Sequence, residues 1–241
     1  MKILAIDTSA LVATAALCDD EKPIAVYSQK SGLTHSQTML PIVKNIMDNT
    51  GTSMDDIDMI AVSEGPGSFT GIRIGIATVK GLAFGKEKIC IGVSTLEAMA
   101  RMIAEFCTDA IICPVMDARR NQLYNAVFEM RGGKLLRLCE DRMIEAPVLA
   151  KELDAMDKPV YFIGDGYDIM AKMKLSYQRE TPSACRWQNG YGVAMAALAL
   201  YNNTEDKSVF TDRMLRPEYL RLPQAERELK EKEASQGNQE N

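Results

Sequence analysis

Residues 63–75, with the sequence SEGPGSFTGIRIG, combine glycines and hydroxyls with a following helical pattern, as phosphate-binding loops do. A Walker loop needs Lys-Ser or Lys-Thr after its last glycine, whereas Ile72 follows Gly71 here. A dinucleotide fingerprint needs the spacing GxGxxG, and Gly65, Gly67 and Gly71 give one residue too many. The loop therefore matches neither nucleotide motif, and a generic anion site at the start of the helix is left as the minor alternative.

The same segment carries a stripe of small residues that continues into the helix. Gly71, Gly75 and Thr78 recur at helical spacing, and a glycine inside a helix costs about 0.5–1 kcal/mol relative to alanine. Such a face allows another backbone to approach closely. We predict that this backbone belongs to another helix, from a second chain. The alternative is that the stripe packs against the chain's own sheet.

A second polar group, Asp7-Thr8-Ser9, ends the first apolar run of the chain. In actin-like ATPases a carboxylate at this place helps to hold a metal–nucleotide, so these three residues are candidate cofactor contacts. However, no glycine follows Asp7. The alternative is that its carboxylate caps the local turn through hydrogen bonds.

His35 is the only histidine of the 241 residues, and none of the six cysteines forms a CxxC pair. Zinc and iron sites take three or four ligands, mostly from histidine and cysteine, so no metal site is predicted. No GxSxG elbow accompanies His35, which we expect to be a cap or an interface residue. No catalytic residue is predicted, because the acids at loop starts lack the spacing of a catalytic pair: Glu64, Glu97, Asp117 and Asp165.

The composition is typical of a soluble globular protein, with 46% hydrophobic residues, 25% charged residues and a net charge of −5. A negative chain is not expected to offer a large basic face, so another chain should supply most contacts to any RNA. No apolar run approaches the ~20 residues that cross a bilayer, and the N-terminal run is typical of a buried strand. The cysteine pattern indicates free thiols in a reducing cytoplasm.

Hydrophobic periodicity predicts the elements that position these residues. The first half is expected to begin with three strands in an antiparallel meander, at 2–9, 14–18 and 23–28. After them we expect a helix at 35–49, a strand at 59–63, a helix at 70–84, a strand at 88–93 and a helix from 94 onward. This order is that of a ribonuclease-H-like domain, a mixed sheet covered by helices.

The helix predicted at 35–49 carries more apolar surface than a single sheet contact needs. Its apolar side chains span an arc of ~160°, whereas a stripe of ~100° is enough to cover a sheet. The surplus indicates a second apolar contact, and burial inside the same domain is the alternative. The side chains are Met39, Leu40, Ile42, Val43, Ile46 and Met47.

A second unit begins near Ala110 and repeats the element types of the first in a shorter form. The chain is predicted to divide into an N-terminal lobe with the pairing surface (1–105) and a smaller C-terminal lobe (106–204). A segment that packs back on the lobes (205–233) and a disordered tail (234–241) are predicted to follow. Charge pairs four residues apart predict a short solvated helix in the third part, from Glu226 to Lys232.

Five segments together resemble the TsaB (YeaZ) family, in that family's order. They are LAIDTS at 4–9, THSQTMLP at 34–41, SEGPGSFTGIRIG at 63–75, MDARRNQLY at 116–124 and YLRLPQAER at 219–227. The resemblance implies an α/β protein of the actin/Hsp70/sugar-kinase fold, with two ribonuclease-H-like lobes built on mixed sheets.

The resemblance also implies a function. TsaB proteins are cytoplasmic, non-catalytic partner subunits in making N6-threonylcarbamoyladenosine on tRNAs that read ANN codons. Their paralogue TsaD binds a metal through a His-x-x-x-His motif and transfers the threonylcarbamoyl group, and the ATPase TsaE joins them. The chain is thus expected to pair with TsaD, to form a homodimer when alone and to meet tRNA indirectly. No tightly bound cofactor is expected, and ATP or ADP at the partner interface is left open.

Family members pair through the first-lobe helices, which here correspond to the helices after 34–36 and after 67–70. The residues expected to bind the partner are His35, Met39, Leu40, Val43, Met47, Phe69, Gly71, Arg73, Gly75 and Thr78. Two enzymes are the alternatives: a small actin-like ATPase or kinase that uses Asp7, and a glycoprotease homologue, for which the metal ligands are missing.

Overall fold

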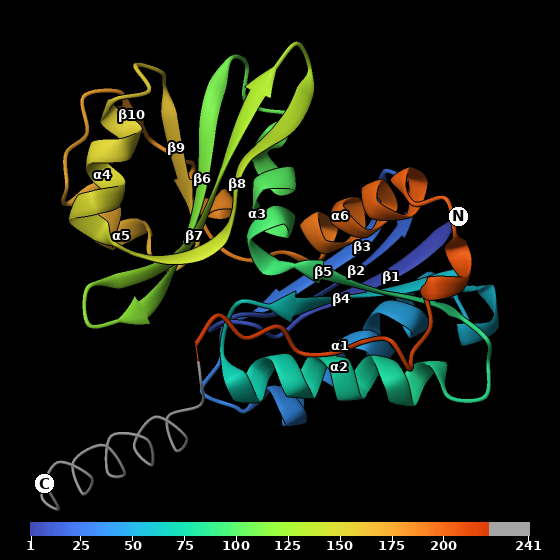
Figure 1. The fold of residues 1–241 in the computed structure, drawn as a ribbon. Helices are drawn as coiled ribbons and strands as arrows, with labels where there is room; N and C mark the ends of the chain where they lie inside the picture. Colours follow the sequence, from blue (N-terminus) through green and yellow to red (C-terminus); the bar gives the residue numbers. More distant parts are fainter. Residues whose placement is uncertain (222–241) are drawn as a thin grey trace, which may run out of the picture.

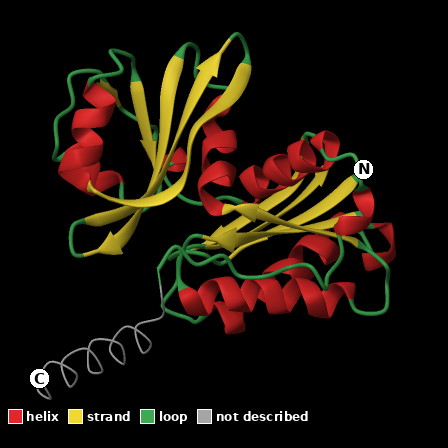
Figure 2. Ribbon diagram, in the orientation of Figure 1, coloured by secondary structure: helices red, strands yellow, loops and turns green. Residues whose placement is uncertain are grey.

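The structure is a computed structural model, and it describes residues 1–221 of the chain. Two sheets lie side by side, with two helices between them and further helices on their outer faces (Figures 1 and 2). The short helix predicted at 226–232 and the disordered tail predicted at 234–241 lie outside the described residues. In residues 1–221, no helix has the length and apolar character needed to cross a membrane.

The first sheet has five strands in the order β3-β2-β1-β4-β5. β1 (Lys2–Asp7), β2 (Ala13–Asp19) and β3 (Lys22–Gln29) form the predicted antiparallel meander. β4 (Met59–Gly65) and β5 (Ile89–Ser94) extend the sheet in parallel on the other side of β1. Because β1 and β4 are parallel neighbours, their carboxyl ends bring Asp7 and loop 63–75 together.

Two helices cover one face of this sheet, α1 (His35–Thr50) and α2 (Phe69–Ala83) (Figure 1). α1 begins where the Gln37 side chain accepts a hydrogen bond from the Thr34 amide, and it ends at Gly51, which has a left-handed φ of +62°. α2 begins at Ser68, the side chain of which accepts a hydrogen bond from the Gly71 amide. Both predicted helices are confirmed within one residue at each end.

The opposite face is covered by α3 (Thr95–Ala104) and α6 (Gly190–Asn203), which lie between the two sheets (Figure 1). α6 is rich in alanine and glycine because it packs closely against both the sheet and α3. A Cβ atom on Gly192 would lie 2.2 Å from the carbonyl oxygen of Ala98. Small residues therefore allow the two lobes to share one pair of helices.

The second sheet has the order β10-β9-β6-β7-β8. Its strands are β6 (Ala110–Arg119), β7 (Gln122–Arg131), β8 (Lys134–Glu145), β9 (Val160–Ile163) and β10 (Gln178–Arg179). Like β1, the central β6 has an antiparallel neighbour on one side and a parallel neighbour on the other. The two lobes thus share a strand order, and the predicted α/β fold with two ribonuclease-H-like lobes is confirmed.

The remaining helices are short. α4 (Ala146–Asp154) and α5 (Tyr167–Ala171) pack on the outer face of the second sheet, and three single-turn 3₁₀ helices are η1 (Met54–Asp56), η2 (Ser183–Cys185) and η3 (Lys207–Val209). β8 is twelve residues long, since it pairs with β7 along nearly the whole of that strand.

After α6 the chain returns across the first lobe, over residues 205–221 (Figure 1). The Cys90 amide donates to the carbonyl of Phe210 (3.1 Å), and the Glu218 amide donates to the carbonyl of Glu64 (2.7 Å). Leu215, 3% exposed, joins the core under α1 and α2. This segment therefore lies directly on loop 63–75.

Candidate functional site

Asp7 lies at the end of β1, and its side chain is buried. Oδ1 accepts hydrogen bonds from the amide (2.7 Å) and the hydroxyl (2.6 Å) of Ser9, and Oδ2 accepts one from the hydroxyl of Ser63 (2.7 Å). Burial raises the pKa of Asp7 above its ordinary value, although the bonds from Ser9 and Ser63 oppose that shift. Both carboxylate oxygens are used inside the chain, which supports the alternative in which Asp7 organises its own turn.

Thr8 and Ser9 tie the end of β1 to the start of α2. The Thr8 hydroxyl donates to the carbonyl of Gly71 (2.7 Å), and the Ser68 amide donates to the carbonyl of Ser9 (2.7 Å). Thr8 and Ser9 are as buried as Asp7, with at most 1% of each residue exposed. A nucleotide contact by these three residues stays a prediction, and it would require the hydrogen bonds described here to open.

The two glycines at the centre of loop 63–75 are required by close backbone contacts. Gly65 and Gly67 have φ angles of +141° and +159°, a region that favours glycine. A Cβ atom would lie 2.1 Å from the Glu218 carbonyl oxygen at Gly65, and 2.4 Å from the Ser9 carbonyl oxygen at Gly67. The space that a phosphate would take next to these glycines is therefore occupied by the chain itself.

The glycine stripe of α2 faces β1 and β4 of the same chain. A Cβ atom on Gly71 would lie 2.0 Å from the Thr8 carbonyl oxygen. On Gly75 it would lie 2.6 Å from the Thr8 hydroxyl and 3.1 Å from a methyl group of Val62. The prediction that Gly71 and Gly75 provide a close-approach face for a second chain is wrong, because the first lobe itself fills that face. The sequence showed that a close approach exists but not which backbone makes it.

Two further residues of the predicted pairing face belong to the core. Met39 is 1% and Val43 is 4% exposed, and both pack between α1 and the first sheet. The prediction that they contact a partner is wrong, because the wide apolar arc of α1 is used within its own lobe, as the alternative proposed. Met47 is half-buried at the edge of the same core, and Thr78 is half-buried on α2.

The starts of α1 and α2 meet at the loop that follows β1. Nε2 of His35 lies 2.6 Å from the carbonyl oxygen of Ala10, one residue after the Ser9 carbonyl that holds Ser68. His35 therefore anchors the start of α1 to the loop that follows β1. The loop itself exposes Leu11, which is 58% accessible to solvent.

An aromatic and cationic cluster stands at the same end of α2. The Phe69 and Tyr219 rings stack with centroids 4.0 Å apart, and Nε of Arg73 donates to the Tyr219 hydroxyl (2.7 Å). The Arg73 guanidinium also lies 5.7 Å and 5.6 Å from the Phe69 and Tyr219 ring centroids. Tyr219 was not predicted as a site residue, although it begins the segment 219–227 and lies in the part of the chain predicted to pack back on the lobes. The sequence does not show that this part meets α2.

The exposed and half-buried residues around these helix starts form a candidate docking surface, here called the helix-start surface. Leu33 and Leu40 are 57% and 53% exposed, which is high for leucine side chains on a single chain. The members of the surface are Leu11, Leu33, His35, Leu40, Phe69, Arg73 and Tyr219. It retains His35, Leu40, Phe69 and Arg73 from the residues predicted to bind a partner.

Two carboxyl groups near the junction of the lobes have shifted pKa values. Burial, and then the nearby Glu218, raise the pKa of Glu64 to about 7. Burial, and then Asp117, raise the pKa of Asp165 to about 6, although the Asp117 amide donates to Asp165. In the part of the chain that the structure describes, no three histidine, cysteine or acidic residues are grouped so that they could hold a metal ion.

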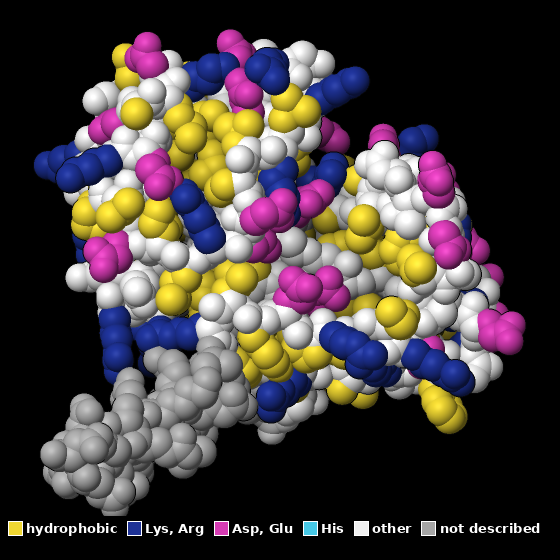
Figure 3. All heavy atoms as spheres, viewed as in Figure 1, with side chains coloured by type: hydrophobic (Ala, Val, Ile, Leu, Met, Phe, Trp, Pro, Cys, Tyr) yellow, Lys and Arg dark blue, Asp and Glu magenta, His cyan; other side chains and the backbone are white. Residues whose placement is uncertain are grey.

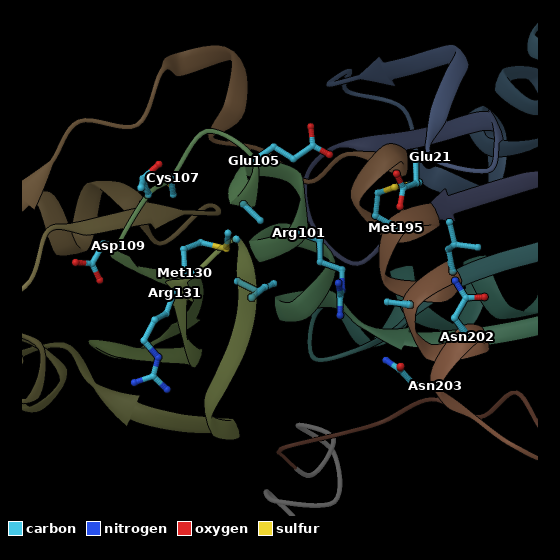
Figure 4. A pocket seen from close by; sticks show the side chains of 17 residues that line it. Glu21, Arg101, Glu105, Cys107, Asp109, Met130, Arg131, Met195, Asn202 and Asn203 are labelled. Atoms are coloured by element: carbon cyan, nitrogen blue, oxygen red, sulfur yellow. The ribbon is translucent and has the colours of Figure 1, made fainter.

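A hollow of about 1040 Å³ lies between α3, α6 and the turn that joins β7 to β8 (Figure 4). Figure 4 shows apolar side chains, among them Met130 and Met195, together with charged ones at its rim. The rim carries both signs of charge, from Arg101 and Arg131 and from Glu21, Glu105 and Asp109, so it selects no ligand charge. No residue predicted to bind a cofactor or a partner lines it.

Comparison with known proteins shows which family this chain belongs to. Residues 25–228 match the family model of TsaD, described as tRNA N6-adenosine threonylcarbamoyltransferase. The chain is also 33% identical over 173 residues to the tRNA threonylcarbamoyladenosine biosynthesis protein TsaB of Bacillus subtilis, covering 72% of this chain and 75% of that protein. The chain belongs to the TsaB family. This confirms the predicted resemblance and supports involvement in tRNA threonylcarbamoyladenosine biosynthesis.

Other relatives agree with membership of the TsaB family. Escherichia coli TsaB is 40% identical over 129 residues, which span 54% of this chain and 55% of that protein. A solved Pseudomonas aeruginosa protein described as similar to peptidase YEAZ superposes with a TM-score of 0.75 at 23% identity, covering 91% of this chain and 99% of that one. Component A of (R)-2-hydroxyglutaryl-CoA dehydratase from Acidaminococcus fermentans shares the fold alone, with a TM-score of 0.51 at 10% identity, covering 84% of this chain and 98% of that one.

Proposed function

We propose that this chain is a non-catalytic subunit that activates a TsaD partner. The partner would transfer the threonylcarbamoyl group to N6 of the adenosine next to the anticodon in tRNAs that read ANN codons. The observation that carries the proposal is the closed end of β1, where Ser9 and Ser63 use both oxygens of the Asp7 carboxylate. In a protein built this way, the strand-end residues stiffen a loop instead of holding a reactive group.

The helix-start surface is the proposed contact with TsaD. It combines exposed leucines with the Phe69–Tyr219 stack, and such apolar and aromatic groups are typical of the centre of a protein interface. Hydrogen bonds from Thr8, Ser68 and His35 fix the backbone beneath it, so little conformational freedom is lost on binding. The same surface would pair two copies of the chain when TsaD is absent, and TsaE would join the assembled pair in the cytoplasm.

Reconstitution tests the proposal. Purified TsaD, TsaE and the enzyme that makes threonylcarbamoyl-AMP are incubated with tRNA, with or without this chain, and modified adenosine is measured by mass spectrometry. We expect threonylcarbamoylation to collapse when the chain is omitted. Full modification in its absence would contradict the proposal.

A pair of variants locates the contact within the same assay. Leu40→Glu places a charge on the helix-start surface and should abolish both TsaD binding and stimulation. Phe106→Glu makes the same kind of change at a residue that is 78% exposed beyond the end of α3, and it should leave both unchanged. Equal effects of the two substitutions would contradict the assignment of the surface.

A further inference from the structure

The tip of the hairpin between β6 and β7 has a left-handed backbone conformation that most of its residue types disfavour. Arg119, Arg120 and Asn121 have φ angles of +65°, +56° and +59°. Asparagine tolerates this left-handed region, but an arginine there brings Cβ too close to its own backbone. All three side chains are exposed, so packing does not account for the two arginines. Glycine would suit the fold better at positions 119 and 120.

The backbone of this tip is held from three sides. Asp117 Oδ1 accepts a hydrogen bond from the Arg119 amide (2.7 Å), and the Asp117 amide itself donates to Asp165 Oδ1 (3.2 Å). On the other side, the Ala146 amide at the start of α4 donates to the carbonyl of Asn121 (3.2 Å). The two arginine side chains therefore extend from a fixed base on the projecting hairpin (Figure 1).

A third guanidinium reaches the same hairpin from the returning C-terminal segment. Nη1 of Arg221 donates to the carbonyl oxygen of Ala118 (2.9 Å). Within residues 1–221, no carboxylate forms an ion pair with Arg119, Arg120 or Arg221. Figure 3 shows Lys and Arg side chains at this end of the molecule, as well as on other parts of the same face. A chain with a net charge of −5 thus presents a local cluster of cations.

We propose that Arg119, Arg120 and Arg221 bind phosphate groups of the RNA substrate. This inference rests on the proposed function, in which the RNA reaches the chain through its TsaD partner. A guanidinium presents a planar set of donors that matches two phosphate oxygens, and contacts to phosphates fix the position of an RNA without reading its sequence. Three contacts are a minor share of a tRNA-binding surface, in keeping with the negative charge of the whole chain.

The chemistry of the tip favours RNA over a protein partner. Its exposed residues, from Arg119 to Asn121, are all polar, Gln122 is half-buried, and the neighbouring Ala118 and Leu123 are buried. A protein interface usually needs an apolar centre to contribute affinity, whereas a phosphate backbone needs only donors and charge. The backbone strain at 119 and 120 is then the cost of placing two guanidinium groups side by side.

The test exploits that strain. The double variant Arg119→Asn/Arg120→Gly removes two charges and replaces them with residues that suit positive φ, so its melting temperature should rise by about 2 °C or more. Affinity of the assembled complex for tRNA should fall about tenfold near physiological salt. The slope of log K against log salt should fall by about 1.4–1.8, since each phosphate contact contributes about 0.7–0.9.

A matched double variant controls for net charge. Arg131→Ala/Lys134→Ala removes two exposed cations at the opposite end of β7, and it should leave affinity and salt slope unchanged. An unaltered slope in the hairpin variant, or an equal loss in the control, would overturn the inference. So would a loss of TsaD binding in the hairpin variant, because the arginines would then face a protein. A wild-type chain that fails to stimulate transfer contradicts the proposed function instead, and the RNA-binding comparison still decides the hairpin.

Discussion

Substituting Gly71 with alanine should destabilise the chain, whereas substituting Gly81 on the same helix should stabilise it. A Cβ atom on Gly71 would lie 2.0 Å from the Thr8 carbonyl oxygen, whereas an ordinary contact is 3.4–4 Å. Among residues 1–221, and apart from the neighbouring backbone of α2 itself, no atom lies within 4 Å of the corresponding position on Gly81. The two variants carry the same chemical change, so only the surroundings of each glycine distinguish them.

The magnitude follows from what must move. The end of β1 and the start of α2 have to separate by more than 1 Å, which forces a well-packed core apart at about 1–3 kcal/mol. The same movement weakens the hydrogen bond from the Thr8 hydroxyl to the Gly71 carbonyl (2.7 Å), worth about 1 kcal/mol. The gain in helix propensity, about 0.5–1 kcal/mol, roughly offsets the weakened hydrogen bond. Gly71→Ala should therefore lower the free energy of unfolding by about 1–3 kcal/mol, and Gly81→Ala should raise it by about 0.5–1 kcal/mol.

Urea unfolding followed by circular dichroism measures the free energy of unfolding of both variants. The comparison requires that this free energy falls with urea concentration at the same slope in the two variants. Gly75→Ala should fall between them, since its closest contacts are a hydroxyl at 2.6 Å and a methyl group at 3.1 Å. A Gly71→Ala chain that is as stable as wild type but no longer pairs would refute the reasoning. It would show that the glycine face meets a second chain, as the sequence first suggested.

Three further outcomes follow from the same contacts. Stability should fall as pH rises from 4.5 to about 7, because the folded state favours protonated Glu64, the pKa of which is raised to about 7. Glu64→Gln should remove about 3 kcal/mol of this pH dependence in the free energy of unfolding. The control variant Glu140→Gln, at an exposed residue, should leave the pH dependence unchanged. Ser63→Ala leaves an oxygen of Asp7 buried without a donor, so thermal or urea unfolding should show a loss of about 1–3 kcal/mol, and an unchanged stability would contradict the closed strand end. Tyr219→Ala should weaken TsaD binding by about tenfold or more in calorimetry with a smaller effect on stability, and undiminished binding would exclude Tyr219 from the interface.

Much of the fold is predictable from the sequence because its signals are local. Continuous apolar runs mark β1, β2 and β4 as strands buried on both faces, and the residues that cap α1 and α2 mark the starts of those helices. The sequence also indicates a close backbone approach along α2, from the small residues Gly71, Gly75 and Thr78. The positive φ angles of Gly65 and Gly67 are known only from the structure.

The contacts that decide the candidate site are not local, and sequence patterns do not report them. Gly71 faces Thr8 across 63 residues of chain, and the Arg73 contact with Tyr219 spans 146 residues. The helical period shows which face of α2 carries small side chains. Only the tertiary packing determines that the end of β1 lies against that face. For the same reason the apolar arc of α1 could not distinguish a partner from its own sheet.

The most direct test of the account is a titration of this chain into a fixed amount of TsaD, with threonylcarbamoylation of tRNA as the readout. The account predicts no modification by the chain alone, and a rate with TsaD that rises with the chain and reaches a plateau when the partner is saturated. The Asp7→Ala variant, wherever it remains folded, should reach the same plateau. Modification by the chain without TsaD, or a plateau abolished in folded Asp7→Ala, would contradict a non-catalytic role.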